Sequence, residues 1–503
     1  MSLRPSVLCG PSGESCGAIG APVTSSEDLV WMPATELARL YRSGEASPTE
    51  VVDAVIHRLR AVDPLVNAFV TVTEDLARQQ AQEAEALFRS GDDIPPLCGI
   101  PVTVKDLIDT AGVRTTYGCK SWKDNVPEED AISWQRLKQA GAILIGKTTT
   151  PEYGMLGVTE SHLTGTTGTP WDPTRTSGGS SGGAAAAAAA GVGPLALGSD
   201  GGGSIRVPAA CCGVVGLKPS TGRIPIRGNT EPDTAEGPLT RTVADAALML
   251  SVLAGPHHED RLSLPATGER YLEVVAEAPV VSELRIAYSA DLGQGPIDPL
   301  TRSTIEQTLA AAEHAGAFVE PVELTLPDAI DFFVAYWGPE FADFVDDILK
   351  PSGDYWPLMG EVADRARKLT AAEVSRAVRG LKTQIYNEFD RVLQTHDVII
   401  TPTTPVPPFP HAGDKGGLDE VDGQPVRMPG LYFHRLTEPP SHAGLPAVSI
   451  PAGFTPDGMP VGMQLIGRLH ADGEVLAAAA ALEALAPWAH RRPLASIARG
   501  AAK

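Results

Sequence analysis

The stretch "GGSSGGAAAAAAAGVGPLALGSDGGGSIR", residues 178–206, decides the fold. Two turns rich in glycine and serine flank an alanine run and the apolar segment "PLALG", which predict a short helix followed by a buried strand. Glycine lets backbone amides approach a substrate closely and adopt positive φ angles, as an oxyanion hole requires. A flexible linker would not be interrupted by a helix and a strand. We therefore interpret the stretch as two serines held on glycine turns, which is typical of nucleophilic acyl transfer.

Short apolar segments alternate with helical segments along the rest of the chain. The expected strands cover residues 101–104, 142–146, 194–198, 284–289, 398–403 and 447–453. A helix is expected at 47–62, which opens with a capping box and a proline at its first position. This alternation predicts an α/β fold around one mostly buried sheet. Because no internal repeat or long linker divides the chain, residues 29–500 are expected to form one domain behind a loosely ordered extension, residues 1–28.

Composition narrows the classes of partner. The chain has 503 residues, 43% of them hydrophobic and 20% charged, which indicates a globular protein with a large core. Its formal net charge of −22 repels phosphate backbones and anionic membranes, so we expect neither a nucleic-acid nor a membrane partner. Six cysteines without a CxxC pair are typical of a reducing compartment, and a cytoplasmic location is expected. The longest apolar run is too short to cross a bilayer.

Two motifs are expected to be structural. "GAILIGKT", residues 141–148, fits the P-loop pattern, but the residues between its glycines are apolar and a helix precedes them. A buried core strand is therefore expected there. His257, His258, Glu259 and Asp260 have the side chains of metal ligands, yet their adjacent positions predict a solvated loop. We expect neither a metal nor another cofactor.

The glycine turn around Ser180 also matches the nucleophile elbow of α/β-hydrolases. An elbow needs a strand directly before it, whereas "TPWDPTRTS", residues 169–177, is rich in turn-forming residues. An esterase of the α/β-hydrolase type stays an alternative, because His434 and His442 follow in the chain order that such enzymes use.

The 178–206 stretch resembles the amidase signature family when it is taken with three other segments. These are "GIPVTVKDL" at 99–107, "DVIITPTTP" at 397–405 and "GLPAVSIPAGF" at 444–454. The resemblance covers most of residues 30–485. It implies a single domain with a mixed central sheet covered by helices on both faces, and a hydrolase that cleaves amides through an acyl-enzyme.

The resemblance also implies the site residues. Lys105 would be the base, Ser180 the proton relay and Ser204 the nucleophile, with a cis peptide between Gly179 and Ser180. The remaining residues hold the loop: amides of Gly201, Gly202, Gly203 and Ser204 would form the oxyanion hole, and Ser181, Asp200 and Arg206 would brace it through hydrogen bonds. Lys105 can act as a base only when neutral, and burial would favour that form because a shift of about 3 pKa units corresponds to about 4 kcal/mol.

The substrate is less constrained by the sequence. Phe332, Phe333, Tyr336 and Trp337 lie on one expected helix, and they either pack in the core or line a pocket for small apolar or aryl amides, anilides or carbamates. Gly201 stands where the family commonly has threonine or isoleucine, which would widen the pocket, and the role of His442 is open. The A subunit of a glutamine-dependent tRNA amidotransferase is a second alternative, although "GGSIRVP" differs from the usual "GGSIRQP" of that protein and Leu107 replaces its asparagine. A small-molecule amide is the expected partner, and a homodimer is left open.

Overall fold

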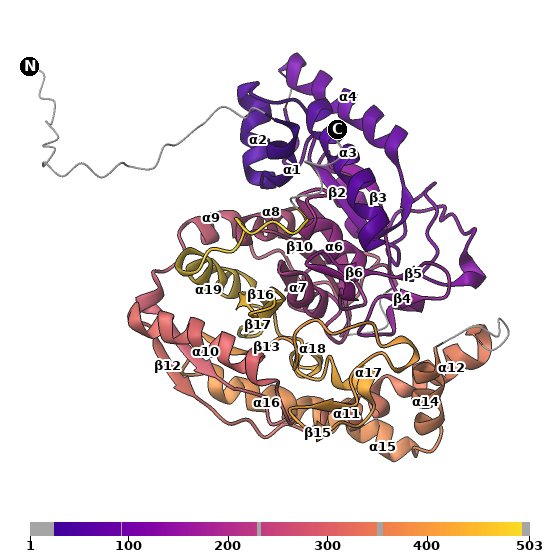
Figure 1. Ribbon diagram of the computed structural model, residues 1–503, viewed down its shortest axis with the longest axis vertical. Helices are drawn as coiled ribbons and strands as arrows, with labels where there is room; N and C mark the ends of the chain where they lie inside the picture. The colour runs from indigo at the N-terminus through magenta and orange to yellow at the C-terminus, as the bar shows by residue number, and fades with distance from the viewer. Residues whose placement is uncertain (1–24, 92, 229–232, 350–355, 495–503) are drawn as a thin grey trace, which may run out of the picture.

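One sheet of eleven strands organises the residues that the computed structural model describes, 25–91, 93–228, 233–349 and 356–494 (Figure 1). In order across the sheet, its strands are β1 (Phe69–Val72), β3 (Ile143–Thr148), β2 (Pro101–Lys105), β8 (Leu195–Asp200), β10 (Ala235–Thr240), β9 (Val215–Lys218), β16 (Ala447–Phe454), β17 (Pro460–Ile466), β13 (Val398–Pro402), β11 (Arg285–Tyr288) and β12 (Phe318–Pro321). Three two-stranded ribbons accompany it: β4 (Glu160–Ser161) with β5 (Gly165–Thr166), β6 (Gly168–Thr169) with β7 (Asp172–Thr176), and β14 (Glu420–Val421) with β15 (Gln424–Pro425).

The sheet is mixed, as predicted. Strand β2 runs parallel to both β3 and β8, and β11 runs parallel to β12 and β13. From β8 through β10, β9, β16 and β17 to β13, each strand pairs antiparallel with the next. Because β2 and β8 are parallel neighbours, their last residues, Lys105 and Asp200, emerge at the same edge of the sheet.

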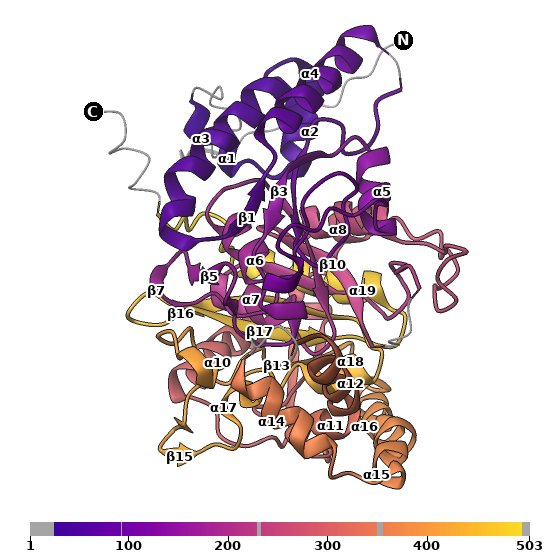
Figure 2. The same cartoon turned by 90° about the vertical axis from the view of Figure 1, so that its right-hand side faces the viewer.

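Helices cover the sheet and extend beyond it at both ends. Their bounds are α1 (Ser26–Trp31), α2 (Ala34–Ser43), α3 (Pro48–Val66), α4 (Glu74–Ser90), α5 (Ile132–Gln139), α6 (Gly182–Ala189), α7 (Arg206–Cys212), α8 (Val243–Leu253), α9 (Tyr271–Ala276), α10 (Pro299–His314), α11 (Ala329–Tyr336), α12 (Gly338–Phe344), α14 (Pro357–Ala366), α15 (Ala371–Arg376), α16 (Lys382–Leu393), α17 (Pro429–Tyr432), α18 (Glu438–His442) and α19 (Asp472–Leu485). In Figure 1, α6 and α7 lie on one side of the strands and α8, α9 and α19 on the other. Figure 2 shows α3 and α4 at one end of the molecule and α11, α14 and α15 at the other.

Helix α6 explains why the decisive stretch contains only small residues. Every residue of α6 is buried, so the helix is apolar all round, as expected for a helix inside a core. A Cβ atom at Gly182 would lie 2.3 Å from Thr159 Oγ1, and one at Gly183 would lie 2.4 Å from Thr149 Oγ1. The two glycines therefore allow the start of α6 to approach its neighbours closely.

The sequence expectations for individual elements are largely confirmed. Each of the six expected strands forms, and Ser47 caps α3 with the expected capping box. The P-loop-like segment is strand β3. Residues 169–177 differ from the expectation, because β7 forms there as one strand of a small ribbon, in which its Pro173 is tolerated at an edge.

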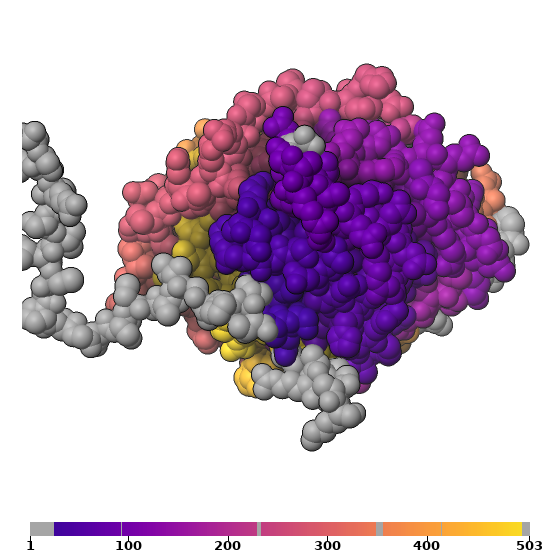
Figure 3. Space-filling model, turned by 90° about the horizontal axis from the view of Figure 1, so that it is seen from above, coloured from indigo at the N-terminus to yellow at the C-terminus, as the bar shows by residue number. Residues whose placement is uncertain are grey.

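The chain ends lie partly outside the described residues. Residues 1–24 of the expected extension are not described, and α1 begins at Ser26, inside the segment assigned to that extension. Figure 3 shows the indigo N-terminal helices beside the yellow C-terminal segment. Arg58 of α3 joins the two by donating to the carbonyls of Pro493 and Leu494. Within the ranges given above, no helix is both long enough and apolar enough to span a membrane.

Candidate active site

A cavity of about 400 Å³ opens at the edge where β2 and β8 end. Ser180, Ser199 and the loop from Gly201 to Ser204 form its floor. Its walls are largely aromatic and aliphatic, with contributions from Tyr117, Tyr153, Phe333, Trp337 and Phe341. The cavity therefore places the predicted serines beneath a mostly apolar pocket.

Lys105 lies fully buried under this cavity. Its Nζ atom is 2.7 Å from Ser180 Oγ and 2.9 Å from Ser199 Oγ. Burial lowers the pKa of Lys105 to about 7, while the more distant carboxylates of Asp200 and Glu236 oppose that shift. A substantial fraction of Lys105 is therefore neutral near pH 7, as a general base requires.

Asp106 does not neutralise Lys105, although the two are adjacent in sequence. Its Oδ2 atom accepts hydrogen bonds from the backbone N–H and the hydroxyl of Thr116. Burial raises the pKa of Asp106, and Lys147 is the cation that opposes this shift most. The side chains of successive residues point to opposite faces at the end of β2, as the strand geometry predicts.

Ser180 occupies the turn between β7 and α6. The peptide bond between Gly179 and Ser180 is cis, as the family resemblance implies. Ser181 follows and accepts a hydrogen bond from the Ser199 amide at 3.4 Å, while its own amide donates to the Ser204 carbonyl at 3.1 Å. Ser181 thus joins the two glycine turns to one another.

Ser204 lies on the second turn, between β8 and α7. Its side chain is partly exposed and lines the same cavity as Ser180. The expected hydrogen bond between the Ser180 and Ser204 hydroxyls is not formed in the described part of the chain. Catalytic contacts of this kind are often long before substrate binds and tighten in the complex.

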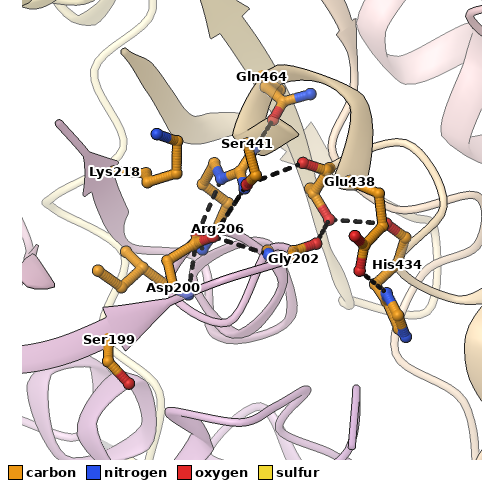
Figure 4. A network of polar contacts seen from close by, with 12 residues as sticks. Ser199, Asp200, Gly202, Arg206, Lys218, His434, Glu438, Ser441 and Gln464 are labelled. Carbon is orange, nitrogen blue, oxygen red and sulfur yellow. Dashed lines mark hydrogen bonds and ion pairs between the residues drawn. The ribbon is translucent and has the colours of Figure 1, made fainter. Parts of the chain in front are cut away.

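Asp200 and Arg206 brace the second turn from below, as Figure 4 shows. Asp200 Oδ1 and Arg206 Nη2 are 2.7 Å apart, and both side chains are fully buried. Arg206 also donates to Gln464 Oε1 and Ser441 Oγ, each at 2.6 Å. The buried charge pair is therefore well hydrogen-bonded, and it fixes the loop on the end of the sheet.

One predicted oxyanion donor is engaged elsewhere. The amide of Gly203 donates to Asp200 Oδ1 at 2.7 Å, because Asp200 caps the turn that precedes α7. The amides of Gly202 and Ser204 meet no acceptor among the described residues. Gly201, Gly202 and Ser204 therefore remain the candidate donors of this loop, and the oxyanion role of Gly203, whose amide already donates to Asp200, stays a prediction.

Gly201 gives the pocket additional room, as its departure from the family suggested. A Cβ atom there would lie 3.4 Å from two ring atoms of Trp337. A threonine or isoleucine side chain would extend further toward that indole ring. The glycine thus leaves the Trp337 side of the cavity open.

His442 has a defined position that the sequence left open. Its Nε2 atom is 2.7 Å from Glu438 Oε2, and its Nδ1 atom is 2.8 Å from Asp233 Oδ2. Burial disfavours the charged imidazole, but the two carboxylates outweigh burial and raise the pKa of His442. Glu438 Oε1 is also 2.9 Å from Nδ1 of His434, so two imidazoles hold this carboxylate at the cavity wall.

The aromatic segment divides between the two expected roles. Phe333 and Trp337 line the cavity. Phe332 and Tyr336 instead pack against the His442 ring, with centroid distances of 4.5 and 4.7 Å. Neither the pocket interpretation nor the core interpretation therefore accounts for all four residues.

The histidine-rich loop lies apart from the cavity. His257 is half-buried and His258 is exposed, and neither lines the site. Groups of three or more potential metal-ligating side chains are absent from the described residues.

Comparison with known proteins assigns the family. The Amidase family model matches residues 50–476. The acylamidase of Rhodococcus erythropolis is 38% identical over 479 residues, which cover 94% of this chain and 99% of the relative. The A subunit of the glutamyl-tRNA(Gln) amidotransferase of Prochlorococcus marinus (strain MIT 9303) is 34% identical, with coverage of 88% and 95%. The chain belongs to the amidase signature family.

A solved structure agrees with this assignment. The crystal structure of a bacterial aryl acylamidase of the amidase signature family superposes with a TM-score of 0.85 at 29% identity, covering 93% of this chain and 99% of that one. The fold is therefore that of the family over nearly its full length, and the α/β-hydrolase alternative is excluded.

Sequence reasoning missed Ser199, Glu236 and Glu438 as residues of the cavity. Ser199 is the penultimate residue of β8, one position before Asp200, and that position was the available signal. Glu438 precedes His442 by four residues, so both lie on one face of a helix, but only the fold brings Asp233 to the same histidine.

Proposed function

We propose that the protein is an amidohydrolase that cleaves carboxamide C–N bonds of small-molecule substrates through an acyl-enzyme on Ser204. The observation that carries the proposal is the buried hydrogen bond between Lys105 Nζ and Ser180 Oγ beneath the cavity that Ser204 lines. A lysine in this position has a lowered pKa and a hydroxyl partner, which are the properties of a base in a proton relay.

Each step of the proposed reaction uses a group of this site. Neutral Lys105 accepts a proton from Ser180, which takes one from Ser204, and the Ser204 oxygen attacks the amide carbon. The negative charge that develops on the carbonyl oxygen is stabilised by the amides of Gly201, Gly202 and Ser204. The proton returns through Ser180 to the leaving amine, and water then hydrolyses the ester on Ser204.

The apolar walls favour small apolar or aryl amides, anilides or carbamates. Phe333, Phe341 and Trp337 provide aromatic surface, and Gly201 leaves space beside the indole. The similarity to an acylamidase and to an aryl acylamidase supports the same class of substrate. A cytoplasmic location stays a prediction from the sequence, and a homodimeric assembly stays open.

The amidotransferase alternative is supported by relatives at 34% identity but not by the charges of this cavity. Glutamine carries an α-carboxylate at neutral pH, and a pocket for it needs a cation or several donors. The described residues that line the cavity include three glutamates and neither arginine nor lysine. This wall is a poor receptor for a free amino acid's carboxylate.

The experiment is amide turnover by the purified chain without partner proteins. Incubation with an aryl amide should release the arylamine, and added hydroxylamine should divert part of the acyl group to a hydroxamate. Hydrolysis without hydroxamate formation would contradict the acyl-enzyme. Release of ammonia from glutamine only, with no turnover of aryl amides, would favour the amidotransferase alternative.

A further inference from the structure

The cavity wall carries an unbalanced set of charges. Glu236, Glu340 and Glu438 line it, whereas no arginine or lysine does so within the described ranges. Of these carboxyl groups, Glu438 is held by the imidazoles of His434 and His442.

Glu236 stands next to the catalytic groups across three neighbouring strands. It lies on β10 directly opposite Ser199 of β8, and the Ser199 hydroxyl is 2.9 Å from Nζ of Lys105 on β2. Because β8 lies between β2 and β10, Ser199 stands between Lys105 and Glu236. A substrate amide positioned at Ser204 lies within the same cavity as this carboxyl group.

The Glu236 carboxyl group lacks a partner that a buried acid normally has. Glu236 is 7% exposed, and its Oε2 atom has no hydrogen-bond partner in the part of the chain that the structure describes. The Ser133 hydroxyl interacts with the Glu236 carboxyl group and favours its ionised form, although burial outweighs this effect. Leaving a buried polar group unpaired costs about 1–3 kcal/mol, so such a group marks a place where a ligand can supply the missing partner.

Glu438, in the same cavity wall, has hydrogen-bond partners for both of its carboxylate oxygens. Its two oxygens are each held by one imidazole, that of His434 and that of His442. The two glutamates thus differ in their contacts: both oxygens of Glu438 are bonded to the protein, and one oxygen of Glu236 has no hydrogen-bond partner among the described residues.

We propose that Glu236 is a specificity-determining residue that receives a hydrogen-bond donor, an ammonium or amine group, on the substrate. The inference rests on the proposed amidohydrolase function and narrows its substrate class to amides that carry an amino group away from the scissile bond. Amides that carry a carboxylate at the same place are poorer substrates, because the ionised carboxyl group of Glu236 repels them.

The test is a matched series of para-nitroanilides, the 5-aminopentanoyl, hexanoyl and glutaryl derivatives, which differ in the charge at one end. A second series carries the amine, methyl or carboxylate on the leaving arm. In at least one series, kcat/KM for the amino compound should exceed that of the neutral compound by about tenfold or more, because hydrogen bonds to charged groups are strong. The carboxylate compound should be the poorest substrate.

The Glu236→Gln variant should reduce the ratio of amino to neutral kcat/KM to about one, mainly through a higher KM for the amino compound. Glu236→Asp, which keeps the charge, should retain part of the preference. Glu277→Gln removes an exposed charge from the end of α9 and should leave the ratio unchanged. Equal turnover of amino and neutral compounds by the wild type in both series overturns the proposal, whether or not the variants fold.

The outcomes also separate this inference from the proposed function. Hydrolysis of the neutral anilide without an amine preference refutes the role of Glu236 alone. If Glu236→Gln lost activity equally toward every compound, Glu236 would support Lys105 rather than recognise the substrate. That result would also refute the proposed role of Glu236. No hydrolysis of any compound by the wild type would refute the amidohydrolase function itself.

Discussion

Two lysines on neighbouring strands have almost the same burial but different surroundings. Lys105 on β2 and Lys147 on β3 are both fully buried, and Lys147 pairs with Val104, the residue before Lys105. Burial lowers the pKa of Lys105 to about 7 and that of Lys147 to about 8. Burial alone therefore does not distinguish the two.

The difference lies in what each ammonium contacts. Lys147 donates to the carbonyl of Ile108 and to the hydroxyls of Thr110 and Thr115, and it does not line the cavity. Lys105 instead contacts two serine hydroxyls that do line it. A buried lysine can serve as a base only where its partner can pass a proton to a substrate.

The largest expected effect on activity comes from replacing Ser204, the proposed nucleophile. Ser204→Ala should lower amine release by about 10⁴-fold or more, because removal of a nucleophile disables the whole relay. Stopped assays with and without hydroxylamine should show neither arylamine nor hydroxamate. Residual hydroxamate formation at more than a few per cent of the wild-type rate would place the acyl group on another residue.

The lysines themselves give the next largest effect. Lys105→Met should lower kcat/KM by about 10²–10⁴-fold, the usual contribution of a general base, while the chain stays folded. Lys147→Met should instead lower the free energy of unfolding by about 1–3 kcal/mol, because it leaves buried acceptors unpaired. Steady-state kinetics and thermal unfolding of both variants test these two expectations. Similar kinetic losses in the two variants would remove the distinction between them.

The pH profile sharpens the comparison further. If Lys105 is the base, as proposed, its neutral form is the active one, and kcat/KM should be half-maximal near pH 7 and fall about tenfold per unit at lower pH. Burial also raises the pKa of Glu236 to about 7, so this carboxyl titrates in the same range. The acid limb should persist in Glu236→Gln if it belongs to Lys105. A profile that stays flat between pH 5 and pH 9 would contradict a lysine base.

The smallest effects come from the acceptors of the two lysines. Ser199→Ala removes a hydrogen-bond partner that favours the charged form of Lys105, so the acid limb of the pH profile should move to lower pH by less than one unit. The value of kcat should also fall about tenfold, because the Lys105 amine loses its orientation. Thr115→Val removes the matching partner of Lys147 and should lower stability by about 1 kcal/mol without moving the limb. Measured pH profiles and unfolding curves distinguish them, and a shifted limb in Thr115→Val would count against the separation of the two sites.

Local patterns determined much of this protein. The glycine turns around Ser180 and Ser204, the small-residue helix between them and the capping box at Ser47 are all encoded within a few residues, and the structure has them as expected. The strand-like residues of 142–146 likewise excluded a phosphate-binding loop, because apolar β-branched residues favour a buried strand. The α/β class followed from the alternation of such segments.

Long-range contacts determined the rest. Glu236 comes to lie opposite Ser199, the partner of Lys105, only because β10 pairs with β8, and Asp233 reaches His442 across 209 positions of the chain. The engagement of the Gly203 amide by Asp200 depended on the turn geometry before α7. The sequence by itself indicated the predicted roles of the two serines and the lysine, because those residues lie in local motifs. The charges and the shape of the pocket were decided by strand pairing and helix packing between segments far apart in the chain.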